Sequence, residues 1–232
     1  MKKKLLIIGG DSKISKYLIK ILKNKNIDYI LTSRRKKKIN KNILFFDFLK
    51  IDKFVIPQNI FAVIILAGID GEKKCEKNFF NAKKISKNIL PLIIRNFVKK
   101  KIFICYLSSM AVYNRNSLYG NLRLLAEKKI LDVCKKNKSQ KKICIIRPTK
   151  NLKRIKNNKT KINKFSLKEY FRPVLYENLA KFVSEVVTNK RSGIFNIIGK
   201  KKVFIKKKYY KKRKLFYKCN YLVNEPNFSK LI

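Results

Sequence analysis

The sequence predicts an α/β fold built on a doubly wound parallel sheet, because strand patterns and helix patterns alternate through the first 150 residues. The strand candidates are short, continuous apolar runs, which are typical of parallel strands buried on both faces. The helix candidates between them carry apolar residues at spacings of three and four, as amphipathic helices do. Repeated alternation of the two patterns implies right-handed crossovers, which place helices on both faces of the sheet.

The expected elements can be assigned in chain order. We predict strands at Leu5 to Ile8, Tyr29 to Leu31, Ile43 to Phe46, Phe61 to Leu66, Ile102 to Leu107 and Ile143 to Ile146. We predict helices at Ser15 to Lys23, Phe79 to Val98 and Leu118 to Cys134. Each predicted helix lies between predicted strands, as crossover connections require.

After Arg147 and Pro148 the pattern changes. Thr149 to Lys164 is rich in Lys and Asn without periodicity, so we expect a loop there. A helix is expected at Tyr176 to Thr188 and a strand at Gly193 to Ile198. We therefore divide the chain into a first domain over residues 1–148 and a reduced region over 149–232, in which residues 174–198 pack back on the first domain.

The composition is strongly basic. Lys and Arg number 60 against 13 Asp and Glu, which gives a formal charge of +47. Such an excess is typical of proteins that bind nucleic acid or anionic membranes. Here the lysines are spread along the whole chain together with Ile and Asn, whereas a nucleic-acid footprint is local. A general compositional bias explains the charge better than a specific nucleic-acid partner.

Three other classes of protein are disfavoured. The five cysteines form no CxxC pair and several lie in apolar runs, as buried thiols in a reducing compartment do. Histidine is absent, and no carboxylate or cysteine cluster has the spacing of metal ligands, so no metal site is expected. The apolar run Ile60 to Gly68 is too short to span a bilayer. We expect a cytoplasmic protein with no membrane insertion.

A glycine turn follows the first strand and opens a helix, as in the Rossmann-type dinucleotide-binding fold. There the helix dipole and the first backbone amides hold a pyrophosphate. Gly9 and Gly10 supply the turn, whereas the next two glycine positions of the usual pattern are Ser12 and Ser15. Gly9, Gly10, Ser12, Lys13 and Ile14 are therefore the expected pyrophosphate-binding residues. A simple Gly-Gly turn before a capped helix remains the alternative.

The end of the second strand indicates which dinucleotide is bound. A carboxylate there would bind a ribose 2′-hydroxyl and favour NAD. The sequence instead has Thr32, Ser33, Arg34 and Arg35, and hydroxyl and guanidinium groups suit a 2′-phosphate. We expect NADP, with NAD also possible, or alternatively an ordinary solvated basic loop. Asp47 after the third strand can accept from the adenine amino group or be a turn residue.

Several ordered segments resemble one family. Ser108 to Tyr113 is similar to the S-S-x-x-V-Y strand end, and Tyr119 to Glu127 to the Y-G-x-x-K-x-x-A-E helix start, of extended short-chain dehydrogenases/reductases. Further segments match in the same order: Ala62 to Gly68, Ile146 to Pro148, Pro173 to Ala180 and Gly193 to Ile197. The resemblance covers roughly residues 4–200 and is to the NAD(P)-dependent epimerase/dehydratase family, which acts on nucleotide sugars.

The resemblance implies a catalytic set. Tyr119 would be the acid/base of a hydride transfer between nicotinamide and a sugar carbon, and Ser109 would hydrogen-bond the reacting oxygen. The family's lysine, four residues after the tyrosine, is Arg123 here; it keeps the charge without the compact ammonium. Tyr119 and Arg123 would also contact the cofactor, as would the residues that end the fourth strand, Leu66, Ala67 and Gly68.

The expected function is therefore an NAD(P)-dependent oxidoreductase or epimerase acting on a nucleotide-linked sugar, as in surface polysaccharide synthesis. Lys150, Lys153 and Arg154 could pair with the substrate diphosphate, and the helices Phe79 to Val98 and Leu118 to Cys134 are apolar enough for a homodimer. One alternative is a dinucleotide-binding or scaffold protein without turnover. Another is a nucleic-acid-associated protein that uses the basic, aromatic segment Lys200 to Lys218.

Overall fold

The computed structural model describes residues 3–149, 151–152, 170–171, 173–199, 203–204 and 219–222. Within these ranges the chain forms an eight-stranded sheet of order β12-β10-β6-β5-β4-β1-β2-β3. The strands from β10 to β3 are parallel to one another, and β12 runs antiparallel to β10 at the edge. This is the predicted doubly wound α/β fold, with a Rossmann-type strand order.

The strand bounds agree closely with the predicted ones. The large sheet consists of β1 (Lys4–Ile8), β2 (Tyr29–Ser33), β3 (Ile43–Phe45), β4 (Ile60–Ile65), β5 (Phe103–Leu107), β6 (Ile143–Pro148), β10 (Gly193–Gly199) and β12 (Cys219–Leu222). Two small pairs lie outside it: β7 (Asn151–Leu152) with β9 (Val174–Leu175), and β8 (Tyr170–Phe171) with β11 (Val203–Phe204).

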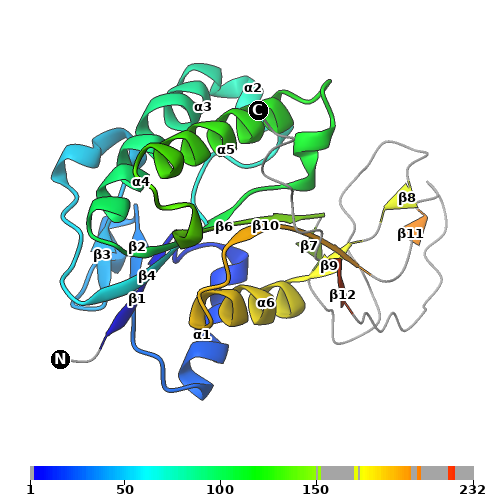
Figure 1. Ribbon diagram of the computed structural model, residues 1–232. Coiled ribbons are helices and arrows are strands. Elements are labelled where there is room, and N and C mark those ends of the chain that lie inside the picture. Colours follow the sequence, from blue (N-terminus) through cyan, green and yellow to red (C-terminus); the bar gives the residue numbers. More distant parts are fainter. Residues whose placement is uncertain are drawn as a thin grey trace.

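Helices cover both faces of the sheet (Figure 1). On one face lie α1 (Lys13–Asn24) and α6 (Tyr176–Thr188), which pack against each other. On the other lie α2 (Glu72–Lys77), α3 (Phe79–Lys84), the π-helix η3 (Ile85–Ile89), α4 (Leu90–Lys99) and α5 (Leu118–Lys136). Short 3-10 helices occur in the connections: η1 (Lys36–Lys38), η2 (Phe48–Lys53), η4 (Met110–Tyr113) and η5 (Gln140–Lys142). No helix in the described ranges is long and apolar enough to cross a bilayer.

One predicted helix differs in detail. The single helix expected at Phe79 to Val98 consists of α3, η3 and α4, and α2 precedes it. Asn78 separates α2 from α3 because its backbone leaves the helical region, at φ −126° and ψ 40°. The π turn adds a residue to the helical register, and Ile89 and Leu90 at its end are both buried.

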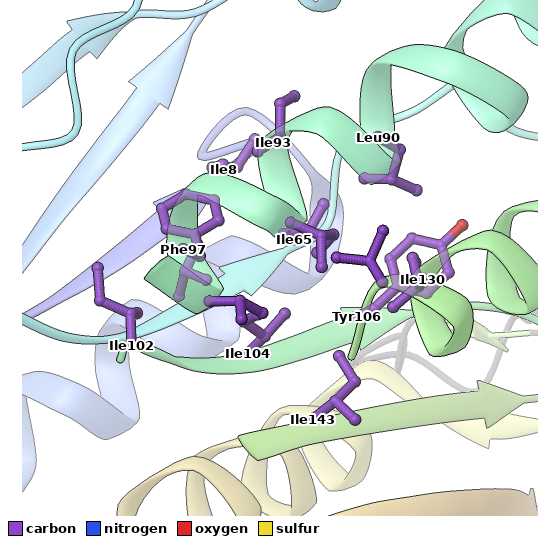
Figure 2. Packing of buried hydrophobic residues seen from close by; sticks show 14 of the residues in the cluster. Ile8, Ile65, Leu90, Ile93, Phe97, Ile102, Ile104, Tyr106, Ile130 and Ile143 are labelled. Atoms are coloured by element: carbon purple, nitrogen blue, oxygen red, sulfur yellow. The ribbon is translucent and has the colours of Figure 1, made fainter. Parts of the chain in front are cut away.

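Two apolar layers hold the fold together. One lies between the sheet and helices α4 and α5, where Ile65, Phe97 and Ile104 are fully buried (Figure 2). The other lies between the sheet and α1 and α6. Because both faces are covered, every side chain of β1 after Lys4 is buried, and this is why its sequence is continuously apolar.

The strand order places a crevice at a defined point. The chain winds from β1 outward to β3 and then returns to β4 on the other side of β1. In open α/β sheets ligands bind at the carboxyl ends of the two strands where the winding reverses. Residues that follow β1 and β4 should therefore form the site.

Candidate functional site

The glycine turn after β1 is pressed against the end of β4. Gly9 has φ +97°, and a Cβ on it would lie 2.8 Å from the backbone nitrogen of Ala67. Its amide donates to Oγ1 of Thr32, at 3.1 Å. Only glycine can adopt this positive φ and approach Ala67 so closely without strain. The Thr32 hydroxyl therefore fixes the turn in place, and its suggested part in binding a 2′-phosphate stays a prediction.

Helix α1 begins directly after this turn. Ser12 is its N-cap, and the Ser12 hydroxyl oxygen accepts from the amide of Ser15 at 3.2 Å. The amides of Lys13 and Ile14 belong to the first turn, whose N–H groups have no partner within the helix. Together with the helix dipole they form an anion-binding surface. The serine at position 15 is fully buried and its hydroxyl makes no hydrogen bond.

The end of β2 carries a small charged cluster. The buried Ser33 hydroxyl donates to Oδ2 of Asp11, and Lys38 Nζ lies 2.6 Å from Oδ1 of the same carboxylate. Arg34 is exposed beside them. Asp47 caps η2 by accepting from the amide of Leu49 at 3.1 Å, which is the turn role considered for it.

Helix α5 carries the predicted catalytic residues on one face. The Tyr119 hydroxyl donates to Oδ1 of Asp70 at 2.7 Å. Arg123, one turn later, donates to the hydroxyl of Tyr106 at 2.9 Å, and its Nη2 is 3.8 Å from Oδ1 of Asp70. The Arg123 guanidinium also lies over both tyrosine rings, 5.1 Å from the centroid of Tyr119 and 5.9 Å from that of Tyr106. A cation in this position attracts the ring faces as well as the hydroxyl oxygens.

The surroundings of Arg123 are complementary to its shape. Tyr106 belongs to β5, and Figure 2 shows its hydroxyl at the outer end of the ring, beyond the isoleucine cluster. A Cβ on Gly68 would lie 3.4 Å from Arg123 Nη2, so the guanidinium reaches the end of β4. The cavity that these residues line measures about 20 Å³, room for about one water molecule. The arginine side chain therefore fills the space at this position.

Two contacts hold the start of α5. Glu72 accepts from the Ser117 hydroxyl at 2.5 Å, from the Leu118 amide at 2.6 Å and from the Tyr119 amide at 3.2 Å. A carboxylate at a helix N-terminus is favoured by the helix dipole. A Cβ on Gly120 would lie 2.1 Å from the carbonyl oxygen of Ala111, so glycine lets α5 approach η4. The Y-G pair of the motif therefore places Tyr119 beside the loop that follows β5.

Ser109 lies in that loop. Its hydroxyl oxygen caps η4 by accepting from the amide of Ala111 at 3.2 Å, and the residue is half-buried. The hydroxyl proton can still be donated to a substrate oxygen. The role predicted for Ser109 stays a prediction.

The proton on Tyr119 is firmly held. Burial raises the pKa of the Tyr119 phenol to about 12, with Arg123 lowering it and Asp70 raising it. Burial opposes the charge on Arg123, yet Tyr106, Tyr119 and Asp70 raise the pKa of its guanidinium overall, so the charge is kept. Tyr119 is therefore a proton donor at neutral pH rather than a phenolate.

A second polar cluster lies at the next turn of α5. Glu127 is 1% exposed and pairs with Arg147 of β6, which donates through Nε to Oε1 and Oε2, at 3.1 Å each, and through Nη2 to Oε2. Ser108 also donates to Glu127. Arg147 Nη1 donates to the Tyr113 hydroxyl at 2.8 Å, which in turn donates to Asn196 at 3.1 Å. The cluster joins α5, β6, η4, β10 and Ser108, the residue after β5.

We compared the chain with known proteins by sequence and by structure. No protein-family model matches the sequence, and no curated protein sequence matches it. A hypothetical dTDP-4-dehydrorhamnose reductase from Sulfolobus tokodaii superposes with a TM-score of 0.69 at 20% identity, over 88% of this chain and 78% of that one. UDP-glucose 4-epimerase from Brucella ovis, in complex with NAD, gives 0.68 at 11% identity, over 87% and 79%. RMD from Pseudomonas aeruginosa, complexed with NADPH, gives 0.67 at 13% identity, over 87% and 80%.

The chain shares the fold of these reductases and epimerases. The identities are low, as the sequence resemblance with its departures at Ser12, Ser15 and Arg123 predicts for a divergent chain.

Sequence reasoning missed some residues of the candidate site. Asp70, Tyr106 and Glu72 were given no role, although Asp70 lies only two residues after the β4 motif. Asp11 was passed over within the glycine turn. A further set of predicted positions lies outside the described residues: Lys150, Lys153, Arg154 and the aromatic positions Tyr209, Tyr210, Phe216 and Tyr217.

Proposed function

We propose that this chain is an NAD(P)-dependent oxidoreductase that reduces a nucleotide-linked sugar. One observation carries the proposal: the glycine turn and the tyrosine cluster meet where the winding of the sheet reverses. Ala67 touches the turn at Gly9, and the neighbouring Gly68 touches Arg123. A dinucleotide binds across such a crevice, so the two ends of one cofactor have partners within one continuous surface.

The donor set fits a nicotinamide dinucleotide. The amides of Lys13 and Ile14 and the hydroxyl of Ser12 suit a pyrophosphate at the start of α1, whereas the Gly10 amide donates to the carbonyl oxygen of Thr32 at 2.9 Å. When bound in reduced form, such a cofactor supplies hydride to a sugar carbonyl carbon. Leu66, Ala67 and Gly68 at the end of β4, with Tyr119 and Arg123, form the rest of the proposed cofactor surface.

The chain's own part in the reaction is proton delivery. Tyr119 gives its hydroxyl proton to the oxygen of the sugar carbonyl, which becomes a hydroxyl group. Arg123, 5.1 Å from the Tyr119 ring, stabilises the phenolate that remains. The phenolate then regains a proton through Asp70, whose side chain is 77% exposed and open to solvent. Ser109 holds the carbonyl oxygen in place.

The direction of this proton transfer favours a reductase. An epimerase must first remove a proton with its tyrosine, which requires a phenolate near neutral pH. Burial and Asp70 raise the pKa of Tyr119 to about 12, although Arg123 lowers it, so the phenol is protonated at neutral pH, the state from which a reductase starts. Epimerisation is the runner-up, and the nucleotide-sugar substrate class rests on the names of the superposed proteins. Surface polysaccharide synthesis is the pathway type we propose.

The cofactor we propose is NADP, with NAD possible. Ser33, Arg34 and Lys38 supply a hydroxyl and two cations at the end of β2, where the ribose 2′ group binds. NADPH and NAD each occur in superposed structures.

The remaining features of the proposal concern assembly and compartment. A homodimer through α3, α4 and α5 is proposed, and oligomeric mass in solution tests it. A cytoplasmic location is proposed because the cysteines at 75, 105, 134 and 144 are buried and unpaired.

The test of the function is consumption of NADPH with a 4-dehydro sugar linked to dTDP, GDP or UDP as the substrate. We expect turnover by the wild type, and a loss of about 10²- to 10⁴-fold in Tyr119→Phe with cofactor binding retained. Tyr29→Phe, at the opposite end of the sheet, is the matched control. Saturable cofactor binding without turnover of any of these sugars would instead support the non-catalytic alternative.

A further inference from the structure

Asp11 lies where the proposed cofactor's 2′ group is expected. It follows the two glycines of the β1 turn, yet its carboxylate reaches across to the end of β2. There it accepts from the Ser33 hydroxyl and pairs with Lys38 Nζ at 2.6 Å. The end of β2 is the place at which this fold recognises the ribose 2′-hydroxyl or 2′-phosphate.

We propose that the Asp11 carboxylate is a built-in occupant of the 2′-phosphate subsite, which NADPH must displace and NADH need not. The proposal rests on the proposed function, because it requires a dinucleotide site. It makes Asp11 a specificity-determining residue that lowers the preference for the phosphorylated cofactor.

The donors around Asp11 are those that a phosphate monoester would need. Ser33 is 5% exposed, so its hydroxyl needs an acceptor within the protein or a ligand. Lys38 and Arg35 add positive charge at the carboxylate, since both act on it electrostatically. A hydroxyl and two cations around one anion form a phosphate site, and in the free protein the anion is Asp11.

The carboxylate remains charged while it occupies this place. Burial works to raise the pKa of Asp11, but the hydrogen bonds from Lys38 and Ser33 and the nearby cations lower it overall. Its side chain is 28% exposed, so it has room to turn outward. A 2′-phosphate carries a charge of about −1.5 to −2 at neutral pH, more than one carboxylate, so it competes well for the same donors.

The size of the effect follows from the population of the open subsite. If Asp11 occupies the subsite in about nine molecules of ten, the affinity for the phosphorylated ligand falls about tenfold. A ligand with a 2′-hydroxyl does not need the subsite cleared. The change in the ratio of the two affinities when the Asp11 carboxylate is removed therefore measures the occupancy.

The test compares ligands that differ only in the 2′ group, NADPH with NADH and 2′,5′-ADP with 5′-AMP, by calorimetry at high salt. We expect Asp11→Asn and Asp11→Ala to tighten NADPH and 2′,5′-ADP about tenfold and to leave NADH and 5′-AMP unchanged. Asp28→Asn, the same charge change at the amino end of β2, is the control and should leave both ratios unchanged. Lys38→Met should weaken 2′,5′-ADP in the wild-type and the Asp11→Ala backgrounds.

Each contrary result has a distinct meaning. Asp11 variants that weaken NADH while leaving NADPH unchanged would overturn the proposal, since Asp11 would then be an acceptor for the ribose hydroxyl. Unchanged ratios in the Asp11 variants would also overturn it, while leaving the proposed function intact. Failure of wild type and Asp11 variants alike to bind any of the four ligands would overturn the dinucleotide site and, with it, both proposals.

Discussion

Helix α5 carries two arginine clusters one turn apart, and they differ in what surrounds the acid. Glu127 is 1% exposed and receives Arg147 through two nitrogens, with Ser108 as a third donor. Asp70 is 77% exposed and lies 3.8 Å from Arg123, which directs its closer contact to Tyr106 instead. The first cluster is closed to water and the second is open on one side.

The difference separates a structural role from a chemical one. A buried ion pair with all its hydrogen bonds made has no reason to exchange a proton, and removing one member leaves an unpaired charge in the core. An exposed carboxylate bonded to a buried tyrosine can pass a proton between that tyrosine and solvent. The two clusters should therefore respond oppositely to substitution, in stability for one and in activity for the other.

The largest expected effect is on stability. Glu127→Gln removes the charge that Arg147 needs, so we expect the free energy of unfolding to fall by about 3–5 kcal/mol. Asp70→Asn should cost less than about 1 kcal/mol, because its carboxylate is exposed. Urea unfolding followed by circular dichroism measures both. Equal losses in the two variants would contradict the division between the clusters.

The next effect concerns Arg123. Its guanidinium bonds Tyr106 and lies over two rings, and lysine can reproduce neither the fork nor the fit. We therefore expect Arg123→Lys to lower kcat/KM about tenfold. Arg115→Lys, at an exposed position, is the control. A gain in activity would instead show that arginine is a damaged version of the family's lysine.

Asp70→Asn should shift the pH profile of the activity. Burial raises the pKa of Tyr119 to about 12; Arg123 lowers this pKa and Asp70 raises it. A general acid is active only below its pKa. Removing the carboxylate lowers the pKa, so the loss of reductase activity at alkaline pH should begin at lower pH. Tyrosinate absorbance during an alkaline titration gives a second measurement of the same shift. A profile identical to the wild type would mean that Asp70 does not act on Tyr119.

The smallest effect is the contribution of Tyr119 to stability at alkaline pH. Its folded pKa of about 12 lies above the ordinary value of 10.0, so its contribution is fully present below pH 10 and is lost as pH rises toward 12. Between about pH 9 and pH 11 the wild type should lose about 1 kcal/mol more than Tyr119→Phe. Parallel curves for the two proteins would show that the phenol is not buried as described.

The fold was predictable from sequence because its signals are local. A parallel strand buried on both faces is continuously apolar, and β1, β4 and β5 show this directly. The proposed catalytic positions could be named from sequence because Tyr119 and Arg123 belong to one motif on one helix. The contacts around these side chains could not be predicted, because the partners are far apart in sequence: 49 residues separate Asp70 from Tyr119, and 22 separate Asp11 from Ser33. The spacing of apolar residues predicts helices and strands, but it does not predict hydrogen bonds between side chains that are distant in sequence.

The antiparallel pairing of β12 with β10 has a consequence for anyone who shortens the chain. Residues Cys219–Leu222 complete the hydrogen bonds of Asn196–Gly199 at the sheet's border. An unpaired border strand is a template for joining another chain, and natural proteins cover or shorten such strands. A truncation after Gly199, the convenient way to remove the basic tail, would therefore also uncover β10. Self-association of such a fragment would reflect this lost pairing, and its behaviour toward nucleic acid would not report on the tail alone.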